Sequence, residues 1–212
     1  MAHTVFLKAL LSGNRMKCSE ISAELLNAGF SIKDLYEKIV KQALYDVGEL
    51  WETGKISVAT EHLASAIVEA NLNEQYYKVI SNTIEINKSV VAACVENEFH
   101  QIGIKMVSDI FEMNGWNAHF LGANTPTNEL IGFIKEVKPD LLALSLSIYF
   151  HLPTLEYMLT AMQQEMPNLP ILIGGQGFRY GGLDILNRYR NLVYLPDLNS
   201  LESFIKQINQ NG

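Results

Sequence analysis

Positive charge is scarce in this sequence. Lysine and arginine together number 16, against 23 aspartates and glutamates, so the formal net charge at neutral pH is −7. A protein that binds nucleic acid through its phosphates needs a basic surface. This balance therefore argues against direct contact with nucleic acid.

Cysteines and long apolar runs are also scarce. The two cysteines, Cys18 and Cys94, are too few for a disulfide framework, and Cys94 lies in an apolar run where a thiol packs as a small hydrophobic side chain. We therefore expect a reduced, cytoplasmic setting. No apolar run approaches the roughly 20 residues of a membrane helix, and the first residues lack the pattern of a secretory signal. We expect no membrane contact.

The first part of the chain, residues 1–85, has helical periodicity. One long stretch begins at Ser31, repeats apolar residues every three or four positions and stops at Gly54. A second long helix is expected from Ser57 to about residue 80, and shorter helices precede both. The pattern predicts a small helical domain, a bundle of four helices.

The remainder, residues 88–212, alternates strands with helices after a polar linker at Ser81–Ser89. The expected strands are Val90–Val95, Ala118–Leu121, Leu141–Ser145, Ile171–Ile173 and Leu192–Leu195. The expected helical stretches are Ile104–Asn114, Asn128–Val137, Leu155–Glu165, Leu183–Tyr189 and Leu201–Asn209. This alternation predicts an α/β domain, a flavodoxin- or Rossmann-like doubly wound sheet of five parallel strands.

Polar residues and glycines follow several of these strands. In folds of this kind ligands bind beyond the carboxyl ends of the strands, near the point where the strand order reverses. Glycine at such a place lets the backbone approach a ligand closely. The candidate residues are Glu98, His100 and Gly103 after the first strand, Ser145 and Ser147 after the third, and Gly174 and Gly175 after the fourth.

The spacing E-x-H-x-x-G, the strand-end serine and the Gly-Gly pair resemble the cobalamin-binding domain family, in which D-x-H-x-x-G, S-x-L and G-G stand at these places. The resemblance extends from about residue 88 to residue 212. It implies that His100 is the lower cobalt ligand, replacing the cofactor's own dimethylbenzimidazole. It also implies that the displaced nucleotide tail enters a slot near Gly103, Ser145, Gly174 and Gly175.

The chemistry of the residues agrees with that role. A neutral imidazole is a good ligand for a transition metal, and its second nitrogen needs a partner that fixes its tautomer. Glu98 is the expected partner, although the family usually has an aspartate there, and Ser145 is expected to extend the hydrogen-bonded relay. Ser147 stands where the family has a leucine. His151, in the same loop, receives no role from the sequence.

The helical part carries a second motif, W-x9-E-H, formed by Trp51, Glu61 and His62. It is similar to the cap of light-responsive regulators that depend on adenosylcobalamin. The resemblance implies that these three residues surround the adenosyl group on the upper face. Those regulators have a histidine directly after the tryptophan, where this sequence has Glu52, and they carry a DNA-binding domain that this sequence does not show.

Three functions remain open. The first is a cobalamin-dependent light sensor, a signalling photoreceptor with adenosylcobalamin as chromophore and a partner protein or a second copy of the chain as its output. The second is a corrinoid subunit that carries a methyl group between methyltransferases. The third is a cobalamin-binding or storage module without a switch. No pattern supplies a substrate site or an acid–base pair for independent catalysis, so we do not expect an enzyme.

Each of these residues also has an ordinary structural interpretation. A histidine in a loop is often held by a neighbour, a serine at a strand end often satisfies the backbone, and paired glycines often form a turn. Trp51 on an apolar helix stripe is often part of the core. A degenerate domain that no longer binds cobalamin is a further alternative, suggested by Glu98 and Ser147.

Overall fold

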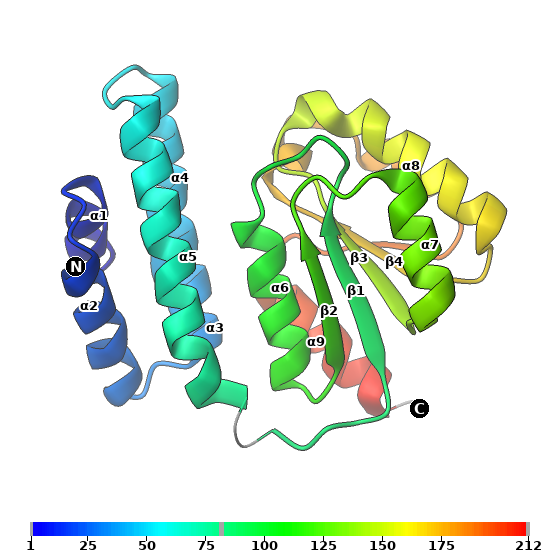
Figure 1. Ribbon diagram of the computed structural model, residues 1–212, viewed down its shortest axis with the longest axis horizontal. Helices are drawn as coiled ribbons and strands as arrows, with labels where there is room; N and C mark the ends of the chain where they lie inside the picture. Colours follow the sequence, from blue (N-terminus) through cyan, green and yellow to red (C-terminus); the bar gives the residue numbers. More distant parts are fainter. Residues whose placement is uncertain (1, 81–82, 211–212) are drawn as a thin grey trace. The chain divides into compact units, whose positions relative to one another are not determined.

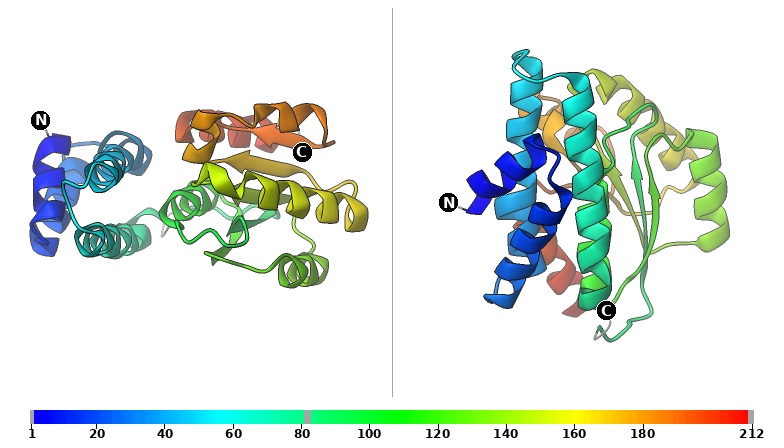
Figure 2. Two further views of the ribbon diagram at one scale, coloured as in Figure 1. Left: turned by 90° about the horizontal axis from the view of Figure 1, so that it is seen from above. Right: turned by 60° about the vertical axis from the view of Figure 1, so that its left-hand side comes forward.

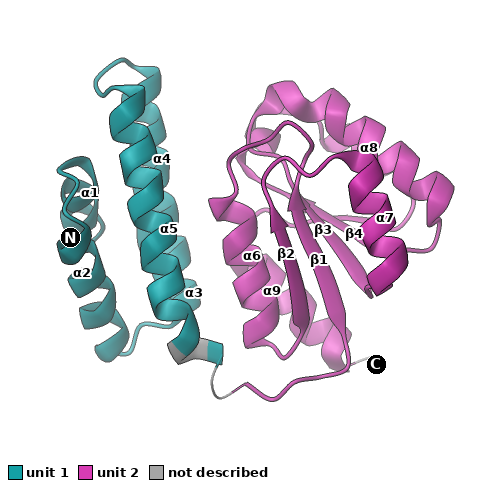
Figure 3. Cartoon of the chain, viewed as in Figure 1, with its two compact units in different colours: residues 1–82 teal, residues 83–212 magenta. Residues whose placement is uncertain are grey.

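The protein is described here by a computed structural model covering residues 2–80 and 83–210. The chain divides into two compact units, residues 1–82 and residues 83–212 (Figure 3). Residues 81 and 82 of the predicted linker lie outside the described residues.

Unit 1 is helical, as predicted. Its elements are α1 (Ala2–Leu11), α2 (Arg15–Asn27), α3 (Ile32–Leu35), the π-helical turn η1 (Tyr36–Val40), α4 (Lys41–Glu52) and α5 (Val58–Ile80). Because α3, η1 and α4 follow one another without a break, residues 2–80 form four helical rods (Figure 1). The predicted four-helix arrangement is therefore confirmed. The core between the rods contains Phe6, Leu10, Leu35, Tyr36, Val40, Val47, Ile67 and Leu72.

The helix boundaries of unit 1 follow from local chemistry. The hydroxyl oxygen of Ser31 accepts a hydrogen bond of 3.0 Å from the Asp34 amide, which caps the start of α3. Gly54 has φ of +69°, a left-handed conformation that ends α4 at the expected place. The long third rod is thus bounded by the two residues that the sequence indicated.

The turn η1 interrupts the hydrogen-bond pattern of that rod. A π-helical turn bonds residue i to residue i+5, which inserts one extra residue into a helix. Tyr36, Ile39 and Val40 within it are buried. The turn therefore lies in the core of unit 1 and is stabilised by the apolar surface that it buries.

Unit 2 is a five-stranded parallel sheet in the order β2-β1-β3-β4-β5. The strands are β1 (Ser89–Cys94), β2 (Asn117–Gly122), β3 (Leu141–Ser145), β4 (Ile171–Gly174) and β5 (Leu192–Tyr194). The helices are α6 (Ile102–Met113), α7 (Thr127–Val137), α8 (Leu152–Glu165) and α9 (Leu198–Gln210), with short 3-10 segments η2 (Tyr149–His151), η3 (Gln176–Tyr180) and η4 (Leu183–Asn187). The strand order reverses between β1 and β3, which confirms the doubly wound prediction.

The sheet is covered by helices on both faces (Figure 2). Apolar side chains on one face, such as Val91 and Leu142, pack with residues of α7 and α8. Their strand neighbours point to the other face because side chains alternate along a strand, and there α6 packs on β1 and β2 and contacts α9. In the described part of the chain, none of the helices is long and apolar enough to cross a membrane.

One predicted helix takes a different form. The stretch predicted at Leu183–Tyr189 contains only the 3-10 segment η4. Gly181 and Gly182 before it have φ of +128° and +88°, so the chain enters η4 from a tight left-handed turn. 3-10 helices are short because their hydrogen-bond geometry is poor, and this one ends after five residues, at Asn187.

Candidate functional site

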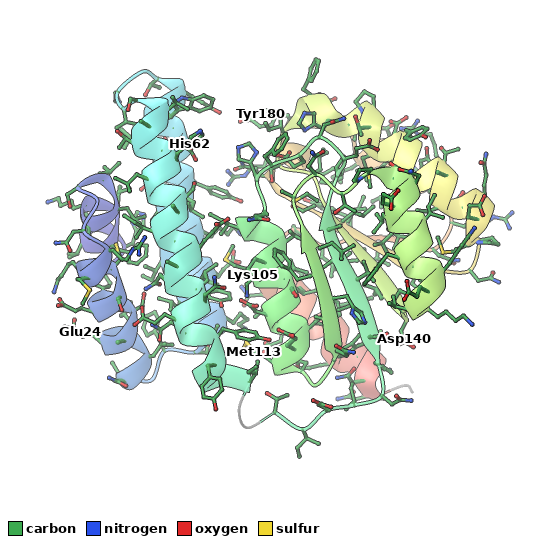
Figure 4. The ribbon with its side chains drawn as sticks, in the orientation of Figure 1. Glu24, His62, Lys105, Met113, Asp140 and Tyr180 are labelled. Atoms are coloured by element: carbon green, nitrogen blue, oxygen red, sulfur yellow. The ribbon has the colours of Figure 1, made fainter. Side chains whose placement is uncertain are left out.

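The loop after β1 is the centre of the candidate site. It lies at the carboxyl ends of the strands, opposite the end at which Asp140 precedes β3. Figure 4 labels Asp140 at the start of β3 and Tyr180 near the carboxyl ends of the strands. The loop turns at Asn97, whose φ is +68°. Asn124 holds it in place, because its side chain accepts a 3.0 Å bond from the Asn97 amide and its own amide donates to the Glu98 carbonyl. The turn is thus tied to the loop that follows β2.

The side chain of Glu98 is fully buried in this loop. Its Oε1 accepts hydrogen bonds from the backbone amide of His100, at 3.1 Å, and from the His100 ring nitrogen Nδ1. Its Oε2 accepts from the backbone amides of Ser147, at 3.2 Å, and Ile148, at 2.8 Å. A buried carboxylate needs such donors, because an unpaired charge in the interior is costly.

The same contacts keep Glu98 ionised. Burial by itself would raise its pKa, but the bonds from the His100 ring and from the amides of Ile148 and His100 outweigh that effect. The pKa of Glu98 falls from its ordinary value of 4.5 to about 2. At neutral pH the carboxylate therefore acts only as an acceptor, and the facing nitrogen of His100 carries a proton.

The ring of His100 is held by Glu98 through one nitrogen, and about half of the side chain is exposed. Its side chain is 52% exposed, although its Nδ1 contacts the buried Glu98 carboxylate. Its carbonyl oxygen accepts the thiol of Cys94 at 3.7 Å and the hydroxyl of Ser147 at 3.5 Å. Since Nδ1 is engaged by the carboxylate, Nε2 is the nitrogen by which this imidazole would ligate a metal.

A residue to which the sequence assigned no role, His151, also reaches this carboxylate. Its Nδ1 lies 3.4 Å from Oε2 of Glu98, and its side chain is 20% exposed. It comes from η2, in the loop that follows β3. The sequence signal that could have found it is its place after the strand that pairs with β1, because loops at the carboxyl ends of adjacent parallel strands lie close together.

Ser145 does not join the relay as we expected. It is buried at the end of β3, paired in register with Cys94 and Gly174. Among the described residues its hydroxyl makes no hydrogen bond to Glu98. Two amides further along the chain already occupy the carboxylate. The Ser145 hydroxyl faces Gly103 instead, where an added Cβ would lie 3.9 Å from its oxygen.

The two glycines after β4 serve the packing of the chain itself. Gly175 has φ of +110°, and a Cβ added there would lie 2.2 Å from the carbonyl oxygen of Leu146. A Cβ on Gly174 would lie 3.0 Å from the carbonyl oxygen of Leu195. Gly175 requires glycine because its backbone lies directly against the loop after β3, and Gly174 packs closely against Leu195, the residue after β5. Whether they also border a nucleotide slot stays a prediction.

The second motif lies in unit 1. Trp51 is in the last turn of α4 and is 46% exposed. Glu61 and His62 lie in the first turns of α5, and Figure 4 labels His62. Nδ1 of His62 lies 2.6 Å from Oε2 of Glu61, and the Ser65 hydroxyl donates to the other oxygen at 2.9 Å. The His62 side chain is 75% exposed. These residues therefore carry a polar pair and an aromatic ring on an accessible part of the helical unit.

Comparison with known proteins identifies two matches to family models. A B12 binding domain model matches residues 88–195, and a second B12 binding domain model matches residues 3–74. The first match spans more than half of the chain, and together the two cover most of both units.

The relatives include proteins of two kinds. The HTH-type transcriptional repressor CarH of Myxococcus xanthus is 28% identical over 174 residues, which are 82% of this chain and 57% of the repressor. The trimethylamine corrinoid protein 1 of Methanosarcina acetivorans is 30% identical over 134 residues, 60% of each chain. The chain thus spans somewhat more than half the length of these relatives.

Solved structures show the same fold. The monomethylamine corrinoid protein of Methanosarcina barkeri has a TM-score of 0.80 at 14% identity, covering 96% of each chain. The methanol:cobalamin methyltransferase complex from the same organism has a TM-score of 0.54 at 18% identity, covering all of this chain and 80% of that one. Because the two family models match most of both units, this chain belongs to the B12 binding domain family.

Proposed function

We propose that the chain is a sensory protein that binds adenosylcobalamin, with His100 as the lower cobalt ligand and with light as its signal. Cobalamin binding is the property of its family. One observation carries the finer assignment of the ligand: a half-exposed imidazole whose Nδ1 is held by a fully buried carboxylate. With Nδ1 engaged by the carboxylate, Nε2 is the nitrogen that would ligate the cobalt, and the orientation of the ring is set in advance.

The residues at the end of the sheet fit a cobalt–corrin group. A histidine on a first-row transition metal ordinarily gives its second N–H to a carboxylate or carbonyl, and Glu98 provides that acceptor. The longer side chain of glutamate retains this contact, so the departure from the usual aspartate keeps the pairing. Glu98 and the amides of Ser147 and Ile148 hold the His100 ring in one orientation.

Adenosylcobalamin, when bound, would supply a cobalt–carbon bond that light can break. In this proposal His100 binds the corrin, and Trp51, Glu61 and His62 enclose the adenosyl group. Trp51 offers a broad apolar wall, and the Glu61–His62 pair offers donors and acceptors for the polar edges of the nucleoside. A change in what these residues contact would alter the packing of unit 1 and so shift a two-state equilibrium.

The alternative is a corrinoid subunit that carries a methyl group for a partner methyltransferase. The sequence similarity to a protein named as a trimethylamine corrinoid protein favours it. In both cases the chain acts through another molecule, a partner protein or a second copy, and is not itself the catalyst. The two functions differ in the upper ligand of the cobalt. A sensor of this kind encloses the bulky adenosyl group, whereas a methyl carrier needs an open upper face.

An absorption spectrum tests the proposal directly. Purified protein is mixed with adenosylcobalamin in the dark, then exposed to green light while the spectrum and the oligomeric state are followed. We expect a histidine-ligated spectrum in the dark and a change in spectrum and assembly after light. A response no different from that of the free cofactor would remove the sensor function.

Two variants assign the residues. His100→Ala should keep the fold and lose the histidine-ligated spectrum, and a spectrum and affinity equal to wild type would refute the ligand assignment. Trp51→Ala should weaken adenosylcobalamin more than hydroxocobalamin, because only the larger ligand reaches the tryptophan. Equal losses for both forms, with tight binding of methylcobalamin, would favour the methyl carrier.

A further inference from the structure

The buried carboxylate of Glu98 is shared by two histidines from different loops. His100 contacts Oε1 from the loop after β1, and His151 contacts Oε2 from the loop after β3, at 3.4 Å. His151 is well shielded, with a side chain that is 20% exposed, and its ring lies in edge contact with Phe150 at 6.3 Å between centroids. The arrangement is more than the carboxylate–histidine pair that the sequence indicated.

The direction of the second contact follows from the other partners of Oε2. This oxygen already accepts the backbone amides of Ser147 and Ile148, so Nδ1 of His151 is the donor and carries a hydrogen. Oε2 then receives three donors, the amides of Ser147 and Ile148 and the imidazole of His151. Each donor draws electron density from the carboxylate and makes it a weaker acceptor toward His100.

We propose that His151 is a positioning residue for cobalt ligation, one that acts through Glu98 to limit how strongly His100 donates to the metal. The inference rests on the proposed role of His100 as the lower ligand. A carboxylate that pulls less on the His100 proton leaves the imidazole less anionic, and a less anionic imidazole is a weaker axial ligand. Weaker axial donation favours the lower oxidation states of cobalt.

The length of Glu98 is part of the same arrangement. An aspartate would withdraw the carboxylate by about one carbon–carbon bond, roughly 1.5 Å. Oε2 already lies at 3.4 Å from His151, so the shorter side chain would lose this contact first. Glu98 and His151 therefore form a coupled pair, and a double-mutant cycle can measure the coupling.

The variants are His151→Phe, which fills the space of the imidazole without a donor, and His151→Gln, which keeps an N–H donor. His119→Phe is the matched control, because His119 lies on β2 and packs against Phe133. Each protein is loaded with hydroxocobalamin, and the midpoint potential of the cobalt(II)/cobalt(I) couple is measured by spectroelectrochemistry. The nitrogen splitting in the electron paramagnetic resonance spectrum of the cobalt(II) form is recorded as well.

His151→Phe should bind hydroxocobalamin within about threefold of wild type and shift the potential to more negative values. His151→Gln should restore most of that shift, and His119→Phe should match wild type. In a Glu98→Asp background the His151→Phe change should have no further effect. A potential unchanged in His151→Phe, or an equal shift in the control, would overturn the proposal.

A measurement without cofactor separates this inference from the proposed function. Long-range nitrogen–proton correlation spectra of the cofactor-free protein at neutral pH report the tautomer of each histidine. We expect a proton on Nδ1 of His151, and a proton only on Nε2 would refute the contact. Failure of the proposed function would look different. The tautomer of His151 would be as expected, but the absorption spectrum of the wild-type protein loaded with cobalamin would show no histidine bound to cobalt.

Discussion

Each of the two motifs contains a carboxylate–histidine pair, Glu98–His100 in unit 2 and Glu61–His62 in unit 1, and the two pairs differ in how firmly they are held. In unit 2 the carboxylate of Glu98 is fully buried and accepts backbone amides from two loops. In unit 1 the side chain of Glu61 is 19% exposed and is bonded by its neighbour His62 and by Ser65, one turn further along the helix. The first pair is built into the fold, whereas the second is an arrangement on a helix surface.

The difference is what the proposed roles of the two pairs, lower ligand and upper enclosure, would require. A metal ligand benefits from a rigid carboxylate, because orientation and tautomer are then set before the metal binds. A pair that encloses an exchangeable upper group benefits from freedom to rearrange, because its contacts must change when that group is lost. We therefore expect changes at Glu98 to affect folding, and changes at Glu61 to affect only what is bound.

The largest expected effect comes from deleting the buried carboxylate. Glu98→Ala leaves the amides of His100, Ser147 and Ile148 without their acceptor, and each unsatisfied buried group costs about 1–3 kcal/mol. We expect the free energy of unfolding in urea to fall by about 3 kcal/mol or more. Glu61→Ala should cost less than about 1 kcal/mol, because its partner His62 is 75% exposed and such pairs contribute little. Equal losses would break the contrast between the pairs.

A second effect is the response to acid. The pKa of Glu98 is lowered in the folded protein from 4.5 to about 2, so between these values the unfolded chain binds more protons than the folded one. Stability contributed by this group is therefore complete above pH 4.5 and is lost as the pH falls toward 2. Urea titrations of the cofactor-free protein across this range should show the fall, and Glu98→Gln should reduce it. An identical slope in that variant would assign the acid sensitivity elsewhere.

A smaller effect is expected at two glycines within helices. Gly48 shares a flank of α4 with Leu44 and Trp51, and Gly132 lies in α7; an added Cβ at either meets nothing within 4 Å. Alanine at each should raise the thermal stability of the cofactor-free protein, by up to about 1 kcal/mol. Gly48→Ala should also weaken adenosylcobalamin relative to hydroxocobalamin, and Gly132→Ala should not. The same affinities in both variants would exclude the Gly48 flank from the upper ligand.

The smallest effect concerns the two cysteines, one in each unit. Burial raises the pKa of Cys18 to about 11, and burial together with the charge of Glu98 raises that of Cys94 to about 12. Neither thiol is therefore ionised at neutral pH, and alkylation by iodoacetamide should be undetectable by mass spectrometry in the native protein. Rapid labelling of one cysteine alone would show that its unit opens more readily than the other.

Local patterns predicted much of this structure. The change from helical to alternating periodicity located both halves, and the spacing of Glu98 and His100 identified a carboxylate–histidine pair two residues apart. His151 could not be placed, because its contact with Glu98 depends on how two loops from neighbouring strands approach each other. The packing role of Gly175 could not be predicted either, because a sequence does not show that the carbonyl of Leu146 lies against it. Contacts between distant segments were the part that periodicity does not encode.

The π-helical turn η1 has a consequence for everything that follows it in the rod. Successive residues of an α-helix are rotated by about 100° around its axis, so one inserted residue turns the remainder of the helix by about that angle. Without the insertion at Tyr36–Val40, the flank that carries Gly48 and Trp51 would face a different direction while Ser31 stayed at its start. The buried turn η1, about three helical turns before Trp51, thus sets the direction in which Trp51 leaves the helix axis. Deleting one residue of η1 would change that direction without altering Trp51 itself.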